Sequence, residues 1–184
     1  MILCDGIRDT LSVLVAGVKD TGACGLYGTG GWQAAWLPLF RRAGRVYVAL
    51  DRDATDRAIM LARTFGARRR VLIPPEDLGA KGDLNDWLRV GARGDAAVFW
   101  SVLERALATS PTPWALEIHR LPSDLAPWDL EDHAGVRDLL CEVGHLGPLG
   151  RVAHLGVMAE RYGVALGTLQ EAARELAQSA DAEP

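Results

Sequence analysis

Two aspartates one residue apart, Asp51 and Asp53, follow a short apolar run at Val46 to Leu50. The run is rich in β-branched residues and predicts a buried strand, so the aspartates lie in a turn that opens the next helix. Paired carboxylates at a strand end suit Mg²⁺, which prefers hard oxygen ligands and binds substrate phosphate as well. A simpler interpretation is open too, because aspartate is a common N-cap and Asp53 is placed to cap that helix.

Two further segments carry acidic side chains after apolar runs. Asp5 follows the run at residues 1–4, and Asp83 lies in the loop Lys81-Gly82-Asp83-Leu84-Asn85-Asp86. The carboxyl ends of parallel strands meet at one edge of a sheet, where ligands bind. We therefore expect Asp5 and Asp83 to converge with the Asp51 pair. Lys81 and Arg57 are the basic candidates for binding phosphate there.

Short apolar runs alternate with segments of helical spacing over the first two thirds of the chain. We expect strands at residues 1–4, 23–27, 46–50, 70–73 and 114–119, and helices at residues 7–16, 32–43, 54–65 and 95–108. The first helix has its apolar residues at Ile7, Leu11, Leu14 and Val15. Helical segments between strands imply βαβ units, hence an α/β fold with a mostly parallel central sheet flanked by helices.

The last third of the chain has a different character. Two prolines in residues 109–114 mark a boundary, and helices alone are expected at 129–143, 149–162 and 166–178. We assign an α/β domain to residues 1–119 and a small α-helical module to residues 121–184.

Composition excludes several classes of protein. The 184 residues are 49% hydrophobic and 24% charged, which is typical of a folded globular chain. The apolar segments are too short to span a membrane, and residues 1–18 lack a basic leader, so we expect a cytoplasmic protein with no membrane partner. Three cysteines without CxxC spacing indicate neither a disulfide framework nor a zinc ribbon.

Net charge and aromatic content bear on nucleic-acid binding. The net charge of −4 argues against non-specific coating of nucleic acid, although arginine clusters such as residues 68–70 can still contact phosphates. Trp32 and Trp36 are of a type that stacks on bases, but tryptophans with helical neighbours are more often part of a core.

Two families share the motifs around Asp51. The segment Asp51-Arg52-Asp53-Ala54-Thr55 resembles the DxDx[TV] motif of haloacid dehalogenase-like phosphatases, and Gly82-Asp83-Leu84-Asn85-Asp86 resembles their later acidic loop. Only about 30 residues separate the two motifs, which leaves room for one helix and one strand. That phosphatase fold needs further strands and a lysine between them.

The order of motifs along residues 1–119 resembles the Toprim domain of bacterial, phage and plasmid primases. The resemblance rests on Asp5-Gly6-x-x-Asp9-x-Leu11, on a glycine-rich turn, on Asp51-x-Asp53, and on Lys81-Gly82-Asp83 followed by Asn85-Asp86-Trp87-Leu88. The combination and its spacing are more specific than any one motif. The KGDLNDWL segment is most similar to the primase-type branch.

This resemblance implies metal-dependent nucleotidyl transfer, that is, primer synthesis in DNA replication. Asp51, Asp53 and Asp83 would hold Mg²⁺ or Mn²⁺, and Asp5, Asp51 and Asp53 would be the catalytic group. The implied partners are single-stranded DNA, nucleoside triphosphates and a replicative helicase or another replication protein.

Asp5 departs from the family pattern, which has glutamate at this position. Aspartate keeps the charge but is shorter by one methylene, and a displacement of that size can lower a rate strongly. Two alternatives therefore stand beside the primase hypothesis. One is a catalytically weakened Toprim module that binds partners through its helical tail, and the other is a Toprim-type metal-dependent nuclease.

Overall fold

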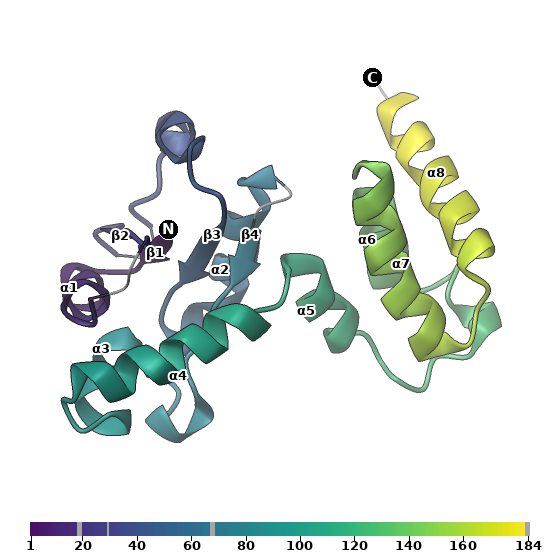
Figure 1. Ribbon diagram of the computed structural model, residues 1–184. Helices are drawn as coiled ribbons and strands as arrows, with labels where there is room; N and C mark the ends of the chain where they lie inside the picture. The colour runs from purple at the N-terminus through teal and green to yellow at the C-terminus, as the bar shows by residue number, and fades with distance from the viewer. Residues whose placement is uncertain (18–19, 29, 67–68, 183–184) are drawn as a thin grey trace. The chain divides into compact units, whose positions relative to one another are not determined.

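The computed structural model describes residues 1–17, 20–28, 30–66 and 69–182. The chain divides into two compact units, Met1–Pro113 and Trp114–Pro184, and each unit has a hydrophobic core of its own (Figure 1). Across the described residues, no helix has both the length and the hydrophobicity needed to cross a bilayer.

A four-stranded sheet forms the centre of the first unit. Its strands are β1 (Ile2–Cys4), β2 (Ala23–Gly25), β3 (Val46–Ala49) and β4 (Arg69–Val71), in the order β2-β1-β3-β4. All three pairings are parallel. The predicted parallel α/β sheet is confirmed, and the two strands that precede Asp5 and Asp51 are neighbours.

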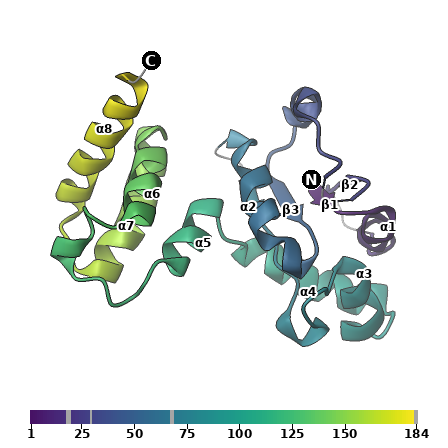
Figure 2. The ribbon, with the colours of Figure 1, turned by 180° about the vertical axis from the view of Figure 1, so that it is seen from behind.

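Helical segments connect and cover these strands. They are α1 (Ile7–Val15), η1 (Ala34–Phe40), η2 (Arg52–Ala54), α2 (Thr55–Arg63), η4 (Glu76–Leu78), α3 (Leu84–Asp86), η5 (Trp87–Gly91) and α4 (Ala96–Thr109). Helix α2 lies on one face of the sheet and α4 on the other (Figures 1 and 2). Phe99, Leu103 and Leu107 of α4 are buried in the core with Ile2 and Tyr47 of the sheet.

The helix expected at residues 32–43 is instead the 3₁₀ helix η1, which has Pro38 inside it and buries none of its residues fully. Proline lacks an amide proton and clashes with the carbonyl four residues earlier, which disfavours a regular α-helix here.

Helix α1 has a different buried face from the one its apolar spacing suggests. Its buried residues are Asp9, Ser12 and Val13. Its apolar residues are largely exposed, namely Ile7, Leu11, Leu14 and Val15. The polar face can be buried because Asn85, at the start of α3, donates its backbone N–H to Asp9 Oδ1 at 3.0 Å. This reversal puts a carboxylate, rather than leucine, against the rest of the unit.

The second unit is helical, and it begins earlier than expected. Its elements are α5 (Pro113–Arg120), η6 (Pro127–Asp129), α6 (Ala134–Gly144), α7 (Pro148–Tyr162) and α8 (Leu166–Ala182). The strand expected at residues 114–119 is wrong, since these residues form α5. Pro113 is favourable at a helix start, and Trp114 and Ile118, one helical turn apart, are both buried in the second core.

The close packing of α6 on α8 requires glycine at position 144. A Cβ there would lie 2.1 Å from the carbonyl oxygen of Ala173 and 2.8 Å from Ala177 Cβ. Gly144→Ala is therefore expected to lower the free energy of unfolding of the helical unit by about 1–3 kcal/mol, as overpacking does. Urea unfolding followed by circular dichroism measures this change. Gly156→Ala in α7 is the matched control, because its Cβ meets open space and alanine favours helix. A stable Gly144→Ala variant would contradict the packing of α6 on α8.

Candidate metal centre

Three aspartates from three separate segments meet at the carboxyl edge of the sheet. One carboxylate oxygen each of Asp9, Asp51 and Asp83 lies within 4.8 Å of the other two. Asp9 is buried and the other two are partly buried. Three acidic oxygens this close repel one another unless a cation or protons neutralise them.

Backbone pairing brings these segments together. Strands β1 and β3 pair with Cys4 opposite Ala49, so the residues after them leave the sheet side by side. The N–H of Arg52 then donates to the carbonyl of Gly82 at 3.0 Å, which ties the turn after β3 to the loop that carries Asp83. The expected convergence of Asp51 and Asp83 at this edge is what the structure shows.

The loop before α3 requires glycine at the position where it passes Leu78 of η4. A Cβ at Gly82 would lie 2.6 Å from Leu78 Cβ, so any side chain would push the loop away from η4. Asp83 then caps α3, because its Oδ1 accepts a hydrogen bond from the N–H of Asp86 at 2.6 Å. This bond fixes the orientation of the Asp83 carboxylate.

Asp5 and Asp53 flank the cluster. Asp5 follows β1 and has a buried Oδ1 atom that accepts no hydrogen bond from the described residues. The charge of Asp5 raises the pKa of both Asp51 and Asp9. Asp53 is exposed and raises the pKa of Asp51 and of Asp5. Both residues are thus close enough to contribute charge.

The capping interpretation of Asp53 is wrong. The N-cap of α2 is Ala54, which provides no side-chain hydrogen bond. The 3₁₀ turn η2 lies between the DxD pair and α2, and its own N-cap, Asp51, makes no side-chain capping bond either. The carboxylates of the DxD pair therefore do not cap the N-terminus of α2.

Burial and mutual repulsion shift the ionisation of the cluster. The pKa of Asp51 is raised to about 6, first by desolvation and then by the charges of Asp5, Asp83, Asp9 and Asp53. Desolvation also raises the pKa of Asp9, with Asp83 and Asp5 adding to it and the N–H of Asn85 opposing it. The pKa of Asp5 is raised by desolvation, then by Asp83 and Asp53. A divalent cation would relieve this repulsion.

The basic candidates are at the surface. Lys81 is exposed in the loop just before Gly82, and Arg57 is exposed on the first turn of α2. Arg52, between the two aspartates, has a structural role: its guanidinium donates to the carbonyl of Pro74 and pairs with Glu76, both at 2.6 Å. Arg52 thereby holds the turn to the segment after β4.

Asp9 is the member of the cluster that was not expected. Its sequence signal is its place four residues after Asp5, on the same face as Ser12 and Val13. The spacing of the apolar residues in α1 predicted that the opposite face would be buried, so this face was not expected to contribute to the site.

Comparison with known families agrees with the geometry. The Toprim domain family matches residues 1–94. This chain belongs to the Toprim domain family. Toprim domains bind divalent metals through acidic residues, and a cluster of such residues, Asp9, Asp51 and Asp83, is present here. The haloacid dehalogenase alternative is thereby rejected. Among curated proteins, none matches the chain.

The residues of this Toprim domain fit a hard divalent cation. All the donors are carboxylate oxygens, which suits Mg²⁺ or Mn²⁺ rather than a thiolate-binding metal. Among the described residues, none donates a hydrogen bond to the buried Oδ1 of Asp5, so this oxygen is a further candidate metal ligand.

Metal affinity and stability are expected to depend on pH in opposite directions. The pKa of Asp51 in the folded protein, about 6, exceeds the value of 3.8 for the unfolded chain. The neutral form therefore stabilises the fold below about pH 4, and this contribution is lost as pH rises through about 6. Metal binding requires the ionised form, so affinity rises over the same window.

Unfolding in urea with EDTA, at pH values across this window, measures the first effect. The Asp51→Asn variant should gain stability relative to wild type as pH rises from about 4 to 7. The Asp77→Asn variant in η4, where the carboxylate is exposed, is the control for loss of a surface charge. A pH-independent difference for Asp51→Asn would contradict the raised pKa.

Proposed function

We propose that this protein is a Toprim protein of DNA replication related to primases, which carries out metal-dependent nucleotidyl transfer, that is, primer synthesis. The observation that carries the proposal is the meeting of three carboxylate oxygens, from Asp9, Asp51 and Asp83, within 4.8 Å at the ligand-binding edge of a parallel sheet. The similarity of the KGDLNDWL segment to the primase-type branch supports this choice among Toprim activities.

The proposed roles follow the placement of each residue. Asp9, Asp51 and Asp83 are the metal ligands that the cluster offers, and Asp53, at the exposed end of the DxD pair, is a further candidate ligand. A bound Mg²⁺ or Mn²⁺ would supply positive charge to phosphate oxygens and favour ionisation of a reacting hydroxyl. Asp5, with a raised pKa, is placed to hold or accept a proton or to serve as an additional ligand.

Substrate binding is proposed for the exposed cations near this edge. Lys81 precedes the acidic loop directly, and Arg57 lies at the start of α2. Each would contact the phosphates of a nucleoside triphosphate, while single-stranded DNA serves as template.

Primer synthesis on single-stranded DNA, with nucleoside triphosphates and Mg²⁺ or Mn²⁺, tests the proposal. The double variant Asp51→Asn with Asp53→Asn should lose activity by about 10³-fold, since it removes two of the charges that act on the phosphates. The Asp77→Asn variant should keep wild-type activity. Equal activity of the double variant and wild type would overturn the catalytic assignment. Metal-dependent cleavage of plasmid DNA without nucleotides would instead favour the nuclease alternative.

The helical unit is proposed to bind a replicative helicase or another replication protein. Trp128 and Leu149 are large apolar residues that remain 79% and 87% exposed on it, and exposed apolar groups of this kind occur at protein interfaces. A pull-down that compares wild type with Trp128→Ser tests this, and unchanged binding of the helicase would count against it.

A further inference from the structure

A pocket lies at the end of β3 opposite to the acidic cluster. It has a volume of about 410 Å³ and is lined by Leu37, Phe40, Arg41, Ala43, Val46, Thr64 and Phe65. Val46 begins β3, whereas Asp51 follows its other end, and Thr64 and Phe65 follow the C-terminal end of α2. The pocket therefore opens at the amino edge of the sheet.

Two aromatic side chains, Phe40 and Phe65, line the pocket, and a third ring packs on them. The rings of Phe40 and Phe65 are 5.1 Å apart at an interplanar angle of 70°. Trp32 packs on both, at 5.9 Å from Phe40 and 5.1 Å from Phe65. None of these rings is fully buried. Partly exposed rings held in place by one another form a rigid apolar surface of the kind on which a base stacks.

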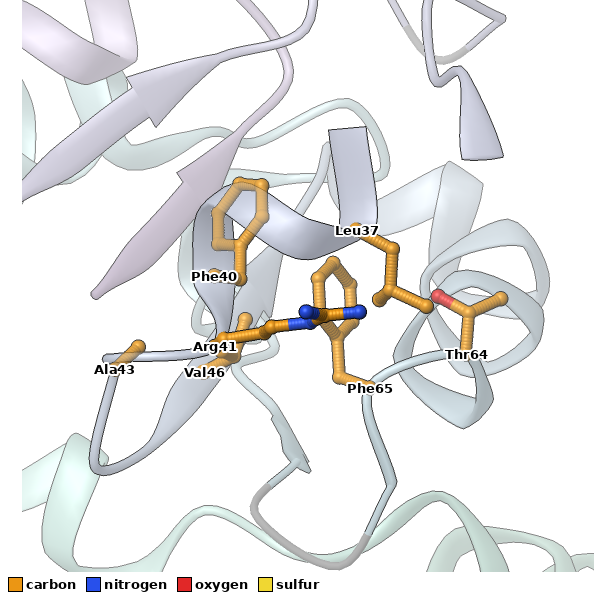
Figure 3. Close-up of a pocket in the computed structure, with 7 residues that line it drawn as sticks. All are labelled: Leu37, Phe40, Arg41, Ala43, Val46, Thr64 and Phe65. Atoms are coloured by element: carbon orange, nitrogen blue, oxygen red, sulfur yellow. The ribbon is translucent and has the colours of Figure 1, made fainter. Parts of the chain in front are cut away.

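One guanidinium enters this pocket. Arg41 extends across it toward Thr64 (Figure 3). Arg41 is exposed, and no carboxylate in residues 1–17, 20–28, 30–66 or 69–182 pairs with it. A cation beside aromatic rings and without an acidic partner is suited to an anionic ligand that also has an apolar part.

The charge of the surrounding chain is one-sided. Residues 21–50 and 57–75 contain no aspartate or glutamate, although the whole chain has a net charge of −4. They contain eight arginines, namely Arg41, Arg42, Arg45, Arg57, Arg63, Arg68, Arg69 and Arg70. All seven residues that line the pocket belong to these two segments. Positive charge is thus concentrated on these two segments, with Arg57, at the start of α2, near the acidic edge and the others outside that turn.

Like charges also lie close together at this end of the strands. Tyr47 pairs with Arg70 across β3 and β4, and Arg45 donates to the Tyr47 hydroxyl at 3.2 Å. Burial, followed by the charge of Arg45, lowers the pKa of Arg70. Tyr47 packs on the α4 side of the sheet, whereas Val46 lines the pocket, so this pair of cations adds positive charge to the same edge on the other face of the sheet.

We propose that this pocket binds single-stranded nucleic acid, with a base against Phe40 and Phe65 and a neighbouring phosphate on Arg41. The inference rests on the proposed function only for the choice of nucleic acid as the polyanion. It assigns a second contact surface, at the opposite edge from the acidic cluster. A strand held there would be kept away from the carboxylates, which repel it when no metal is bound.

Fluorescence anisotropy of a labelled oligothymidylate, in EDTA and at low salt, tests this proposal. Arg41→Gln should weaken binding by roughly three- to tenfold. The slope of log affinity against log salt concentration should also become shallower by about one, the value for one lost phosphate contact. Arg105→Gln on α4, also an exposed arginine, is the matched control and should bind as wild type does. With the wild-type protein, an abasic oligonucleotide of equal charge should bind about tenfold more weakly, because stacking is lost.

The same experiment distinguishes this proposal from the catalytic one. Asp51→Asn should bind the oligonucleotide as well as wild type does, even if primer synthesis is lost or never observed. Equal affinity of Arg41→Gln and wild type, or equal affinity for abasic and normal strands, would overturn the proposal. Competition by polyglutamate as effective as that of the oligonucleotide would assign the pocket to an acidic protein instead. A dimer that Arg41→Gln dissociates would assign it to a second copy of the chain.

Discussion

Asp9→Asn should abolish most metal-dependent activity while making the metal-free protein more stable. Asp9 is only 5% exposed, and burial with the charges of Asp83 and Asp5 raises its pKa. Asparagine keeps an oxygen that can accept the hydrogen bond from Asn85 but removes the charge. Loss of one of three charged donors is expected to weaken metal binding by at least about 100-fold.

Two measurements separate this prediction from a simple loss of folding. Primer synthesis at a Mn²⁺ concentration just sufficient to saturate the wild type should fall sharply in Asp9→Asn, whereas its melting temperature in EDTA at neutral pH should rise. The sign follows from linkage, because a carboxyl whose pKa is raised by folding destabilises the fold once it is ionised. Ser12→Ala, on the same buried face of α1, is the control for a local packing change and should retain metal binding. A less stable Asp9→Asn variant would contradict the electrostatic account of the cluster.

Phe99→Ala should destabilise the first unit by about 3–5 kcal/mol, the cost of an unfilled aromatic cavity in a core. Phe99 is fully buried at 0% exposure and packs edge-on against Trp87 at 6.0 Å between ring centroids. Trp87 directly follows α3, whose N-cap is Asp83. We therefore expect metal affinity to fall together with stability in this variant.

Val98→Ala is the matched control for Phe99→Ala, since the neighbouring Val98 on α4 is 46% exposed. Its free energy of unfolding should change by less than about 0.5 kcal/mol. Both variants are compared by urea unfolding with and without Mn²⁺. If Phe99→Ala were destabilised no more than Val98→Ala, the described core between α4 and the sheet would be wrong.

The parallel sheet and the convergence of Asp51 and Asp83, with Asp5 flanking them, could be predicted from the sequence. Each aspartate follows an apolar run or lies in a loop with turn residues, and parallel strands deliver such positions to one edge whatever the details of packing. Local hydrophobic patterns were sufficient for this part of the fold.

Asp9 and the strand at residues 114–119 show where local patterns failed. Apolar spacing in α1 indicated the face of Ile7 and Leu11, but burial is decided by tertiary partners, and Asn85 satisfies Asp9 from 76 residues away. In the same way, Trp114 and Ile118 are buried as one face of a helix because a second core, built from later helices, covers them. The pocket at Arg41 likewise depends on two segments that only the fold brings together.

Calorimetric titration of Mn²⁺ or Mg²⁺ into the wild-type protein and into Asp51→Asn, near pH 7.5, tests the metal centre most directly. We expect a saturable binding isotherm for wild type and an affinity at least about 100-fold lower for the variant. Absence of binding by the wild-type protein, or the same isotherm for both proteins, would contradict it.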